Sequence, residues 1–168
     1  MNATEIRNLQ APLKEKYRSN SESAIVTLKT RGNLGDNISC KIETGRALSE
    51  AGLHPAAGGD GTYICSGDML LEALTACAGV TLNAVAASMG IKLEKGIVEA
   101  EGDLDFRGTL GVSKDVPVGF KAIRLNFILD SNITQNQTEI LSKLTERFCV
   151  VYQTLINGVK IETSYNKL

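Results

Sequence analysis

The sequence predicts an α+β protein in which helices pack on an antiparallel sheet. Alternating, strand-like segments occur on both sides of a long apolar segment, residues 66–89, which has helical patterning. A second helical segment, residues 132–158, precedes a short strand-like segment near the end of the chain. Neither a repeat nor a linker interrupts the 168 residues, so we expect a single domain over residues 1–168, with residues 1–20 as an N-terminal helical extension.

The first part of the chain predicts a helix, a hairpin and a loop. Apolar residues at helical spacing indicate an amphipathic helix over residues 4–17, and alternation indicates strands over 23–31 and 38–44 that are joined by a turn. Residues 45–52 could add a third strand to this hairpin. The Gly-rich residues 54–68 indicate an ordered loop that leads into the next helix.

The apolar segment predicts a buried core helix. Ser66 is expected as its N-cap, Asp68 lies in the first turn, where a carboxylate interacts favourably with the helix dipole, and Gly90 ends the helix. Polar residues scattered through the segment favour a soluble buried helix over a membrane span. Because the helix is apolar on nearly every face, one small domain does not easily cover it. We therefore expect a homodimer that buries the surplus apolar surface.

The C-terminal half predicts two strands, a helix and a closing strand. Residues 92–108 and 118–131 alternate strongly and are expected to pair in antiparallel orientation. Residues 132–158 are expected to form one helical region that ends at Asn157–Gly158, and residues 159–165 to form the last strand. The apolar face of the helical region consists of Ile140, Leu141, Leu144 and Phe148.

Composition and charge disfavour several classes of partner. The formal net charge is −1, and no basic block exceeds two consecutive residues, whereas a nucleic-acid partner requires a clustered positive surface. The N-terminal residues are polar and charged, which is not the pattern of a secretory signal. We therefore expect a cytoplasmic protein that binds neither nucleic acid nor a membrane.

The four cysteines are too few for a disulfide scaffold in a chain of this size. The chain contains no C-x-x-C and a single histidine, His54, so a zinc site is not expected. Cys40 lies in an expected strand, and Cys65 lies just before a helix start, where the helix dipole could stabilise a thiolate. Cys77 in an apolar helix is by itself typical of core packing. The residues alone leave open whether Cys77 meets Cys149.

Three signatures, taken together, carry a family resemblance. They are "HPAAGGDGTY" (54–63), "SGDMLLEALTACAGVTLNAVA" (66–86) and "LTERFCVVYQTLINGVKIETS" (144–164). In this order and spacing they resemble the OsmC/Ohr family, the osmotically inducible and organic hydroperoxide resistance proteins. The resemblance extends from about residue 22 to residue 165 and is nearest to the broad OsmC-like subgroup.

The resemblance implies the OsmC-like fold, with antiparallel sheets packed around two central helices, and an intertwined homodimer. It also implies a thiol peroxidase that acts in oxidative-stress defence. It implies that Cys77 is the peroxidatic cysteine and that Cys149 resolves it. A thiolate attacks the O–O bond of an organic hydroperoxide and becomes a sulfenic acid. A second thiol within disulfide reach condenses with it, and an external dithiol reduces the product. No cofactor and no metal are expected.

The resemblance also implies an arginine that activates the peroxidatic cysteine. A thiol in the middle of a helix gains little from a helix N-terminus, so we expect a guanidinium to lower the pKa of Cys77. Arg31, at the end of the first strand, matches the family position best. Arg46 is the main alternative, and Arg147 is a third.

An acidic residue near the start of the Cys77 helix is expected to orient that arginine. Asp68 matches this position, and Glu72, one turn later, is the alternative. The chain lacks the proline that usually precedes the acid, and Val150 stands where a proline usually follows the second cysteine. These departures keep a second function open: a non-catalytic OsmC-like dimer that binds a small hydrophobic ligand or senses redox state.

Overall fold

The computed structural model describes residues 3–35, 39–42, 51–129 and 132–165. Its four strands form one antiparallel sheet in the order β2-β1-β3-β4. The strands are β1 (Ile25–Gly35), β2 (Ser39–Ile42), β3 (Gly96–Asp105) and β4 (Phe120–Leu129). The helices are α1 (Ala3–Ser19), α2 (Ser66–Ser88), α3 (Phe106–Thr109), α4 (Gln135–Phe148) and α5 (Val150–Asn157), with two 3₁₀ turns, η1 (Ser21–Ala24) and η2 (Pro55–Ala57).

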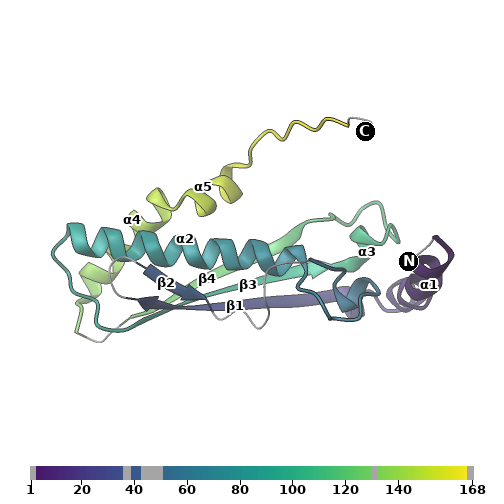
Figure 1. Ribbon diagram of the computed structural model, residues 1–168, viewed down its shortest axis with the longest axis horizontal. Helices are drawn as coiled ribbons and strands as arrows, with labels where there is room; N and C mark the ends of the chain where they lie inside the picture. Colours follow the sequence, from purple (N-terminus) through teal and green to yellow (C-terminus); the bar gives the residue numbers. More distant parts are fainter. Residues whose placement is uncertain (1–2, 36–38, 43–50, 130–131, 166–168) are drawn as a thin grey trace.

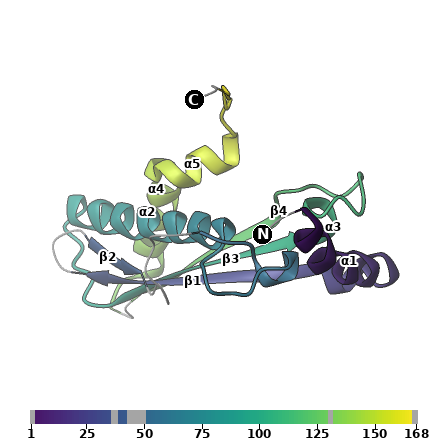
Figure 2. The ribbon, with the colours of Figure 1, turned by 45° about the vertical axis from the view of Figure 1, so that its right-hand side comes forward.

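The long helix α2 lies along one face of this sheet (Figures 1 and 2). Val98 and Ala100 of β3 are fully buried and pack in the same cluster as Leu74 of α2. On the alternate positions of β3, Asp103 accepts hydrogen bonds from Arg124 of β4 at 2.6 and 2.9 Å. One face of the sheet is therefore apolar and covered, and the other is polar, as the period of two along each strand requires.

The fit of α2 on the sheet explains why it is a core helix. By length and composition α2 could cross a membrane, since an 18-residue stretch of it has a mean hydropathy of 1.6. Half of that stretch is buried inside the molecule, however, as in the core helix of a soluble fold. A positive φ of 67° at Gly90 follows its C-cap Met89, so the helix ends where the sequence predicts.

The N-terminal helix α1 is attached to the region that precedes α2. The Tyr17 hydroxyl donates a hydrogen bond of 2.7 Å to the Ala56 carbonyl, and Tyr17 is 2% exposed. Tyr17 also packs with Ala57 and Phe106 in a second apolar cluster. The predicted helix over 4–17 is thus confirmed.

The two predicted antiparallel pairs are confirmed, with corrected boundaries. β1 pairs with β2, and β3 with β4, while β1 also pairs with β3. β1 begins only at Ile25, after η1, and continues to Gly35, beyond the predicted end at residue 31. β3 ends at Asp105 rather than at residue 108, because the Asp105 carboxylate accepts a hydrogen bond from the Arg107 N–H and begins α3.

The structure bears on two expectations about the region that leads into α2. Cys65 occupies the N-cap position, and Ser66 is the first helical residue, because the backbone of Cys65 is extended. Most of the possible third strand, residues 43–50, lies outside the described residues. Its last part, Ala51, forms an isolated parallel bridge with Ile64.

The C-terminal region departs most from the expectation. Residues 132–158 form two helices rather than one, because the chain turns to extended backbone at Cys149 (φ −72°, ψ 110°). Residues 159–165 are not a strand; they extend away from the rest of the chain (Figures 1 and 2), and Ile161 is 79% exposed. A strand requires a neighbour to complete its hydrogen bonds, and this segment has no strand beside it in the described part of the chain.

Candidate active site

Cys77 and Cys149 lie together in the structure. Cys77 is in the middle of α2, and Cys149 joins α4 to α5. Cys77 packs against the apolar cluster that contains Cys149, each thiol affects the pKa of the other, and both are free. Cys149 is fully buried, whereas Cys77 is half-buried. Two thiols in contact in this way are placed for disulfide chemistry.

The backbone around Cys149 produces this contact. The Cys149 N–H donates to the Thr145 carbonyl at 2.8 Å and so ends α4, and the Gln153 N–H donates to the Cys149 carbonyl at 2.9 Å within α5. The Tyr152 N–H donates to the Cys149 sulfur at 3.5 Å, which makes Cys149 the N-cap of α5. The first turn of α5 consequently lies against α2 at Cys77.

The surroundings of Cys77 favour its thiolate. Burial opposes ionisation, but hydrogen bonds to the sulfur from the Val151 N–H, the Cys149 thiol, the Val150 N–H and the Thr81 hydroxyl outweigh it. Together they place the pKa of Cys77 below its ordinary value. Sulfur is the nucleophile only as the thiolate, so these contacts favour a reactive Cys77.

Cys149 has the opposite character. Its burial, together with the nearby Cys77 sulfur, holds the pKa of Cys149 above its ordinary value, although the Tyr152 and Val151 N–H groups oppose this. The pair is therefore asymmetric: Cys77 ionises first, and Cys149 remains a thiol that donates its hydrogen bond.

The expectation that a cation activates Cys77 stays a prediction. A cation was expected because a thiol in the middle of a helix is remote from that helix's own N-terminus. The break at Cys149 starts a second helix, α5, whose Val151 packs on the same apolar cluster as Cys77. Periodicity did not indicate this break, so the position of α5 was missed.

Two of the three candidate arginines stay predictions. Backbone pairing places Arg31 opposite Glu99 of β3, and the Arg31 side chain lies outside the described part of the chain. Arg46 lies outside the described residues. The Arg147 guanidinium lies 5.3 Å from the centre of the Phe148 ring.

Asp68 and Glu72 lie near the start of α2. At 1.5 Å per residue, Asp68 is about 14 Å from Cys77 along the helix axis. Glu72 is nearer but is turned by about 140° around the axis from Cys77, at 3.6 residues per turn. Burial, and then the charge of Asp68, raises the pKa of Glu72. Within one chain, the structure does not bring Asp68 to the cysteine pair.

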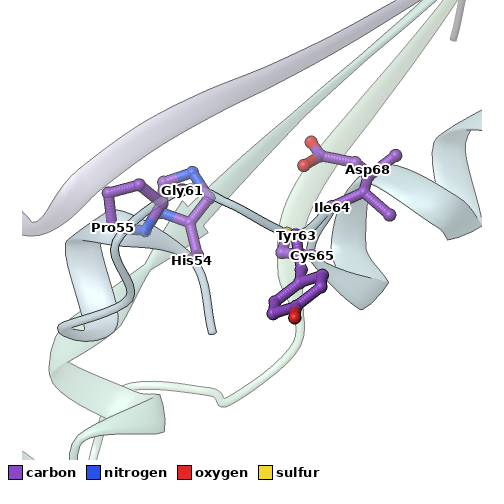
Figure 3. Close-up of a pocket in the computed structure, with 7 residues that line it drawn as sticks. All are labelled: His54, Pro55, Gly61, Tyr63, Ile64, Cys65 and Asp68. Atoms are coloured by element: carbon purple, nitrogen blue, oxygen red, sulfur yellow. The ribbon is translucent and has the colours of Figure 1, made fainter. Parts of the chain in front are cut away.

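Asp68 instead lines a separate pocket of about 260 Å³ with His54, Tyr63 and Cys65 (Figure 3). Burial, followed by the Asp68 carboxylate, keeps the pKa of Cys65 above its ordinary value, so the helix start does not activate this thiol. His54 accepts a hydrogen bond of 3.0 Å from the Ala56 N–H at Nδ1 and stacks on Phe106. His54 thus caps η2. Among the described residues, no group of three or more His, Cys, Asp or Glu side chains is arranged to hold a metal ion.

A second cavity, of about 300 Å³, is lined by residues of β4, α2 and the C-terminal helices, and neither Cys77 nor Cys149 is among them. Its lining includes Leu74, one helical turn before Cys77, and Tyr152, whose N–H contacts Cys149. Other lining side chains are largely apolar: Ile123, Leu125, Phe127, Leu155 and Ile156, with Ser142 and Glu146 as polar members. An apolar group could therefore be accommodated in this cavity.

Comparisons with known proteins agree with this fold. An OsmC-like hydroperoxide resistance protein from Jannaschia sp. CCS1 superposes with a TM-score of 0.59 at 19% identity, covering 86% of this chain and 95% of that one. An OsmC-like protein from Mycoplasma pneumoniae gives 0.53 at 19% identity, covering 80% and 86%. An organic hydroperoxide resistance protein, OsmC, from Legionella pneumophila gives 0.52 at 20% identity, covering 79% and 90%.

At these identities the solved structures establish the likeness of fold. A search of curated proteins gives no significant match. The family model for OsmC-like proteins matches residues 59–164, which is more than half of the chain and includes both Cys77 and Cys149. The chain therefore belongs to the OsmC-like protein family.

Proposed function

We propose that this protein is a cysteine-based thiol peroxidase that reduces organic hydroperoxides at the expense of an external dithiol. The observation that carries the proposal is the contact between Cys77 and Cys149, with their pKa values displaced in opposite directions. A thiolate beside a protonated thiol is the arrangement that a two-cysteine peroxidase requires.

The reaction follows from this arrangement. The Cys77 thiolate attacks the terminal oxygen of the hydroperoxide, so an S–O bond forms, the O–O bond breaks and an alkoxide leaves. The alkoxide takes a proton and departs as the alcohol. Cys149, once deprotonated, attacks the sulfur of the Cys77 sulfenic acid, so a disulfide forms and hydroxide leaves. An external dithiol then reduces the disulfide by thiol exchange.

The apolar cavity between β4, α2 and the C-terminal helices supports an organic rather than an inorganic peroxide. Its lining from β4 and α5 can contact an alkyl group. The printed descriptions of the Jannaschia and Legionella proteins name hydroperoxide resistance. By analogy, we place this protein in oxidative-stress defence in the cytoplasm.

A homodimer is part of the proposal. Apolar side chains remain exposed on α2 and α5 and in the segment that follows them. Val80 is 40%, Val150 70%, Ile156 58% and Ile161 79% exposed. An apolar surface that extends over neighbouring elements is typical of an interface, and a second copy would cover it.

The test is consumption of an alkyl hydroperoxide by the purified, reduced protein in the presence of a dithiol. We expect turnover by the wild type and by Cys65→Ser, which alters a cysteine outside the pair. Cys77→Ser should be inactive. Full activity of Cys77→Ser would overturn the proposal.

The same cavity favours one alternative, a non-catalytic dimer that binds a small hydrophobic ligand. A fluorescent apolar probe distinguishes the two functions. Under the alternative, the probe binds the wild type but the protein does not consume hydroperoxide. Under the proposed function, an alkyl hydroperoxide is consumed and competes with the probe.

A further inference from the structure

We infer that the Thr145 hydroxyl is a hydrogen-bond donor to the Cys149 thiolate in the step that forms the Cys77–Cys149 disulfide. The inference deepens the proposed function and rests on it for the place of this step in peroxide reduction. The observation that carries it is an unpartnered polar atom in the core, one helical turn before Cys149.

The Thr145 hydroxyl is buried without a partner. Thr145 is 0% exposed, and within the described part of the chain its Oγ1 is the buried side-chain oxygen that makes no hydrogen bond. Thr75 of α2 and Thr138 of α4 show the usual arrangement, in which the hydroxyl donates to the carbonyl four residues earlier, at 2.8 and 3.2 Å. A buried hydroxyl that lacks such a bond lowers stability, which indicates a use for it in another state of the site.

The backbone places Thr145 beside Cys149. The Cys149 N–H donates to the Thr145 carbonyl at 2.8 Å, so the two residues keep the helical spacing of four at the end of α4. Side chains at this spacing lie on the same face of a helix, with their Cβ atoms about 5–6 Å apart. Both residues are fully buried. Rotation of the Thr145 side chain about χ1 can therefore bring its hydroxyl to the Cys149 sulfur without movement of the backbone.

The Cys149 sulfur requires donors when it ionises. In the reduced structure it accepts a hydrogen bond of 3.5 Å from the Tyr152 N–H. Burial holds the pKa of Cys149 above its ordinary value, and among the described residues Cys77 of α2 is the titratable group that acts on it. A buried thiolate is costly unless donors satisfy it. The neutral thiol leaves the Thr145 hydroxyl unpartnered, whereas the thiolate would accept its hydrogen bond.

The step conserves atoms and electrons. The Cys149 thiolate attacks the sulfur of the Cys77 sulfenic acid, so an S–S bond forms and the S–O bond breaks. The hydroxide that leaves takes up the proton that Cys149 lost, and water is released. Thr145 keeps its own proton and contributes a hydrogen bond to the attacking sulfur.

Reaction with a chromogenic aromatic disulfide measures this ionisation without a peroxide. In a Cys40→Ser/Cys65→Ser background, Cys77 displaces one coloured thiolate, and Cys149 then displaces the second from the mixed disulfide on Cys77. For Thr145→Val we expect the second release to be about tenfold slower at neutral pH, the equivalent of one hydrogen bond to a charged group. Its pH profile should move to higher pH, and the first release should not change.

Three further variants separate the hydroxyl from packing. Thr145→Ser keeps the hydroxyl and should restore the wild-type rate of the second release. Thr145→Ala repeats the test with a smaller side chain. Thr75→Val removes a buried hydroxyl that has a partner, and it should change neither release. Urea unfolding of reduced Thr145→Val should show no loss of stability, because valine has a similar shape and leaves no unpartnered oxygen in the core.

The outcomes separate this inference from the proposed function. If Thr145→Val and Thr145→Ala keep the rate and pH profile of the second release, or if Thr145→Ser fails to restore them, the role of Thr145 is wrong. If the second release changes as expected but the wild type consumes no hydroperoxide, the role of Thr145 in disulfide formation stands and the peroxidase proposal fails.

Discussion

Cys77, in the middle of α2, packs against the apolar cluster that contains Cys149, which lies at the junction of α4 and α5. This contact joins the core helix to the only break in the C-terminal helical region, as far as the described residues show. It predicts different behaviour for the two cysteine variants.

Cys77→Ser should abolish reduction of an alkyl hydroperoxide, because the attacking thiolate is lost. Cys149→Ser should react once and stop, because nothing condenses with the Cys77 sulfenic acid inside the protein. Trapping with a sulfenic-acid reagent, followed by mass spectrometry, measures this directly. Formation of the internal disulfide in the wild type is the control. Repeated turnover of Cys149→Ser without an internal disulfide would contradict a resolving role for Cys149.

Arg31→Ala should slow alkylation of Cys77 at neutral pH if the arginine implied by the family resemblance contributes to activation. Arg31 matches the family position best, so we expect it to be the main cation that acts on Cys77. Arg31→Lys should recover only part of the rate, since lysine lacks the planar fork, and Asp68→Asn should have a smaller effect than Arg31→Ala.

Two results would change the assignment of the arginine. If Arg46→Ala slows alkylation while Arg31→Ala does not, the activating residue is Arg46. If neither variant changes the rate, no cation of the first hairpin activates Cys77, and the non-catalytic function becomes the better one.

The exposed apolar residues predict a stable dimer. Light scattering at low micromolar concentration should give twice the 18.0 kDa mass of the chain. Val80→Glu and Ile161→Glu should weaken the dimer, because a carboxylate buried in an interface without a partner is costly. Val118→Glu, at an exposed residue of the β3–β4 connection, is the control and should not. A wild-type protein that remains monomeric would exclude the dimer.

Asp105 predicts a dependence of stability on pH. Its carboxylate has a 1% exposed side chain and is held by Arg107, whose hydrogen bonds keep the pKa of Asp105 below its ordinary value despite burial. A carboxyl group with a lower pKa in the folded state stabilises the fold above its unfolded pKa. That contribution is lost as the pH falls through the folded pKa.

Asp105→Ala should therefore lower the free energy of unfolding at pH 7 by about 1 kcal/mol or more, since it also removes the cap of α3. The difference from the wild type should shrink as the pH falls below the unfolded pKa of about 4. Urea unfolding at pH 7 and at acidic pH measures both. Glu15→Gln, in an exposed pair with Arg18, is the control and should change little. An equal loss at both pH values would show that the carboxylate charge is not involved.

Local patterns in the sequence determined most of the elements. Helical spacing in α1, the apolar character of nearly every face of α2 and alternation in β3 and β4 directly indicate the local backbone structure and which side chains are buried. The signatures around Cys77 and Cys149 also carried the family assignment. Boundaries were less certain, because capping contacts such as Asp105 with the Arg107 N–H were not recognised in advance.

Only the tertiary structure decided how the candidate site is built. Whether Cys77 meets Cys149 and where the start of α5 lies both depend on contacts between residues distant in the chain. The break at Cys149 leaves no mark on the apolar periodicity of residues 132–158, yet it places the start of α5 on the same apolar cluster as Cys77. A pKa depends on neighbouring donors and on burial, and both are set by packing rather than by neighbours in the sequence.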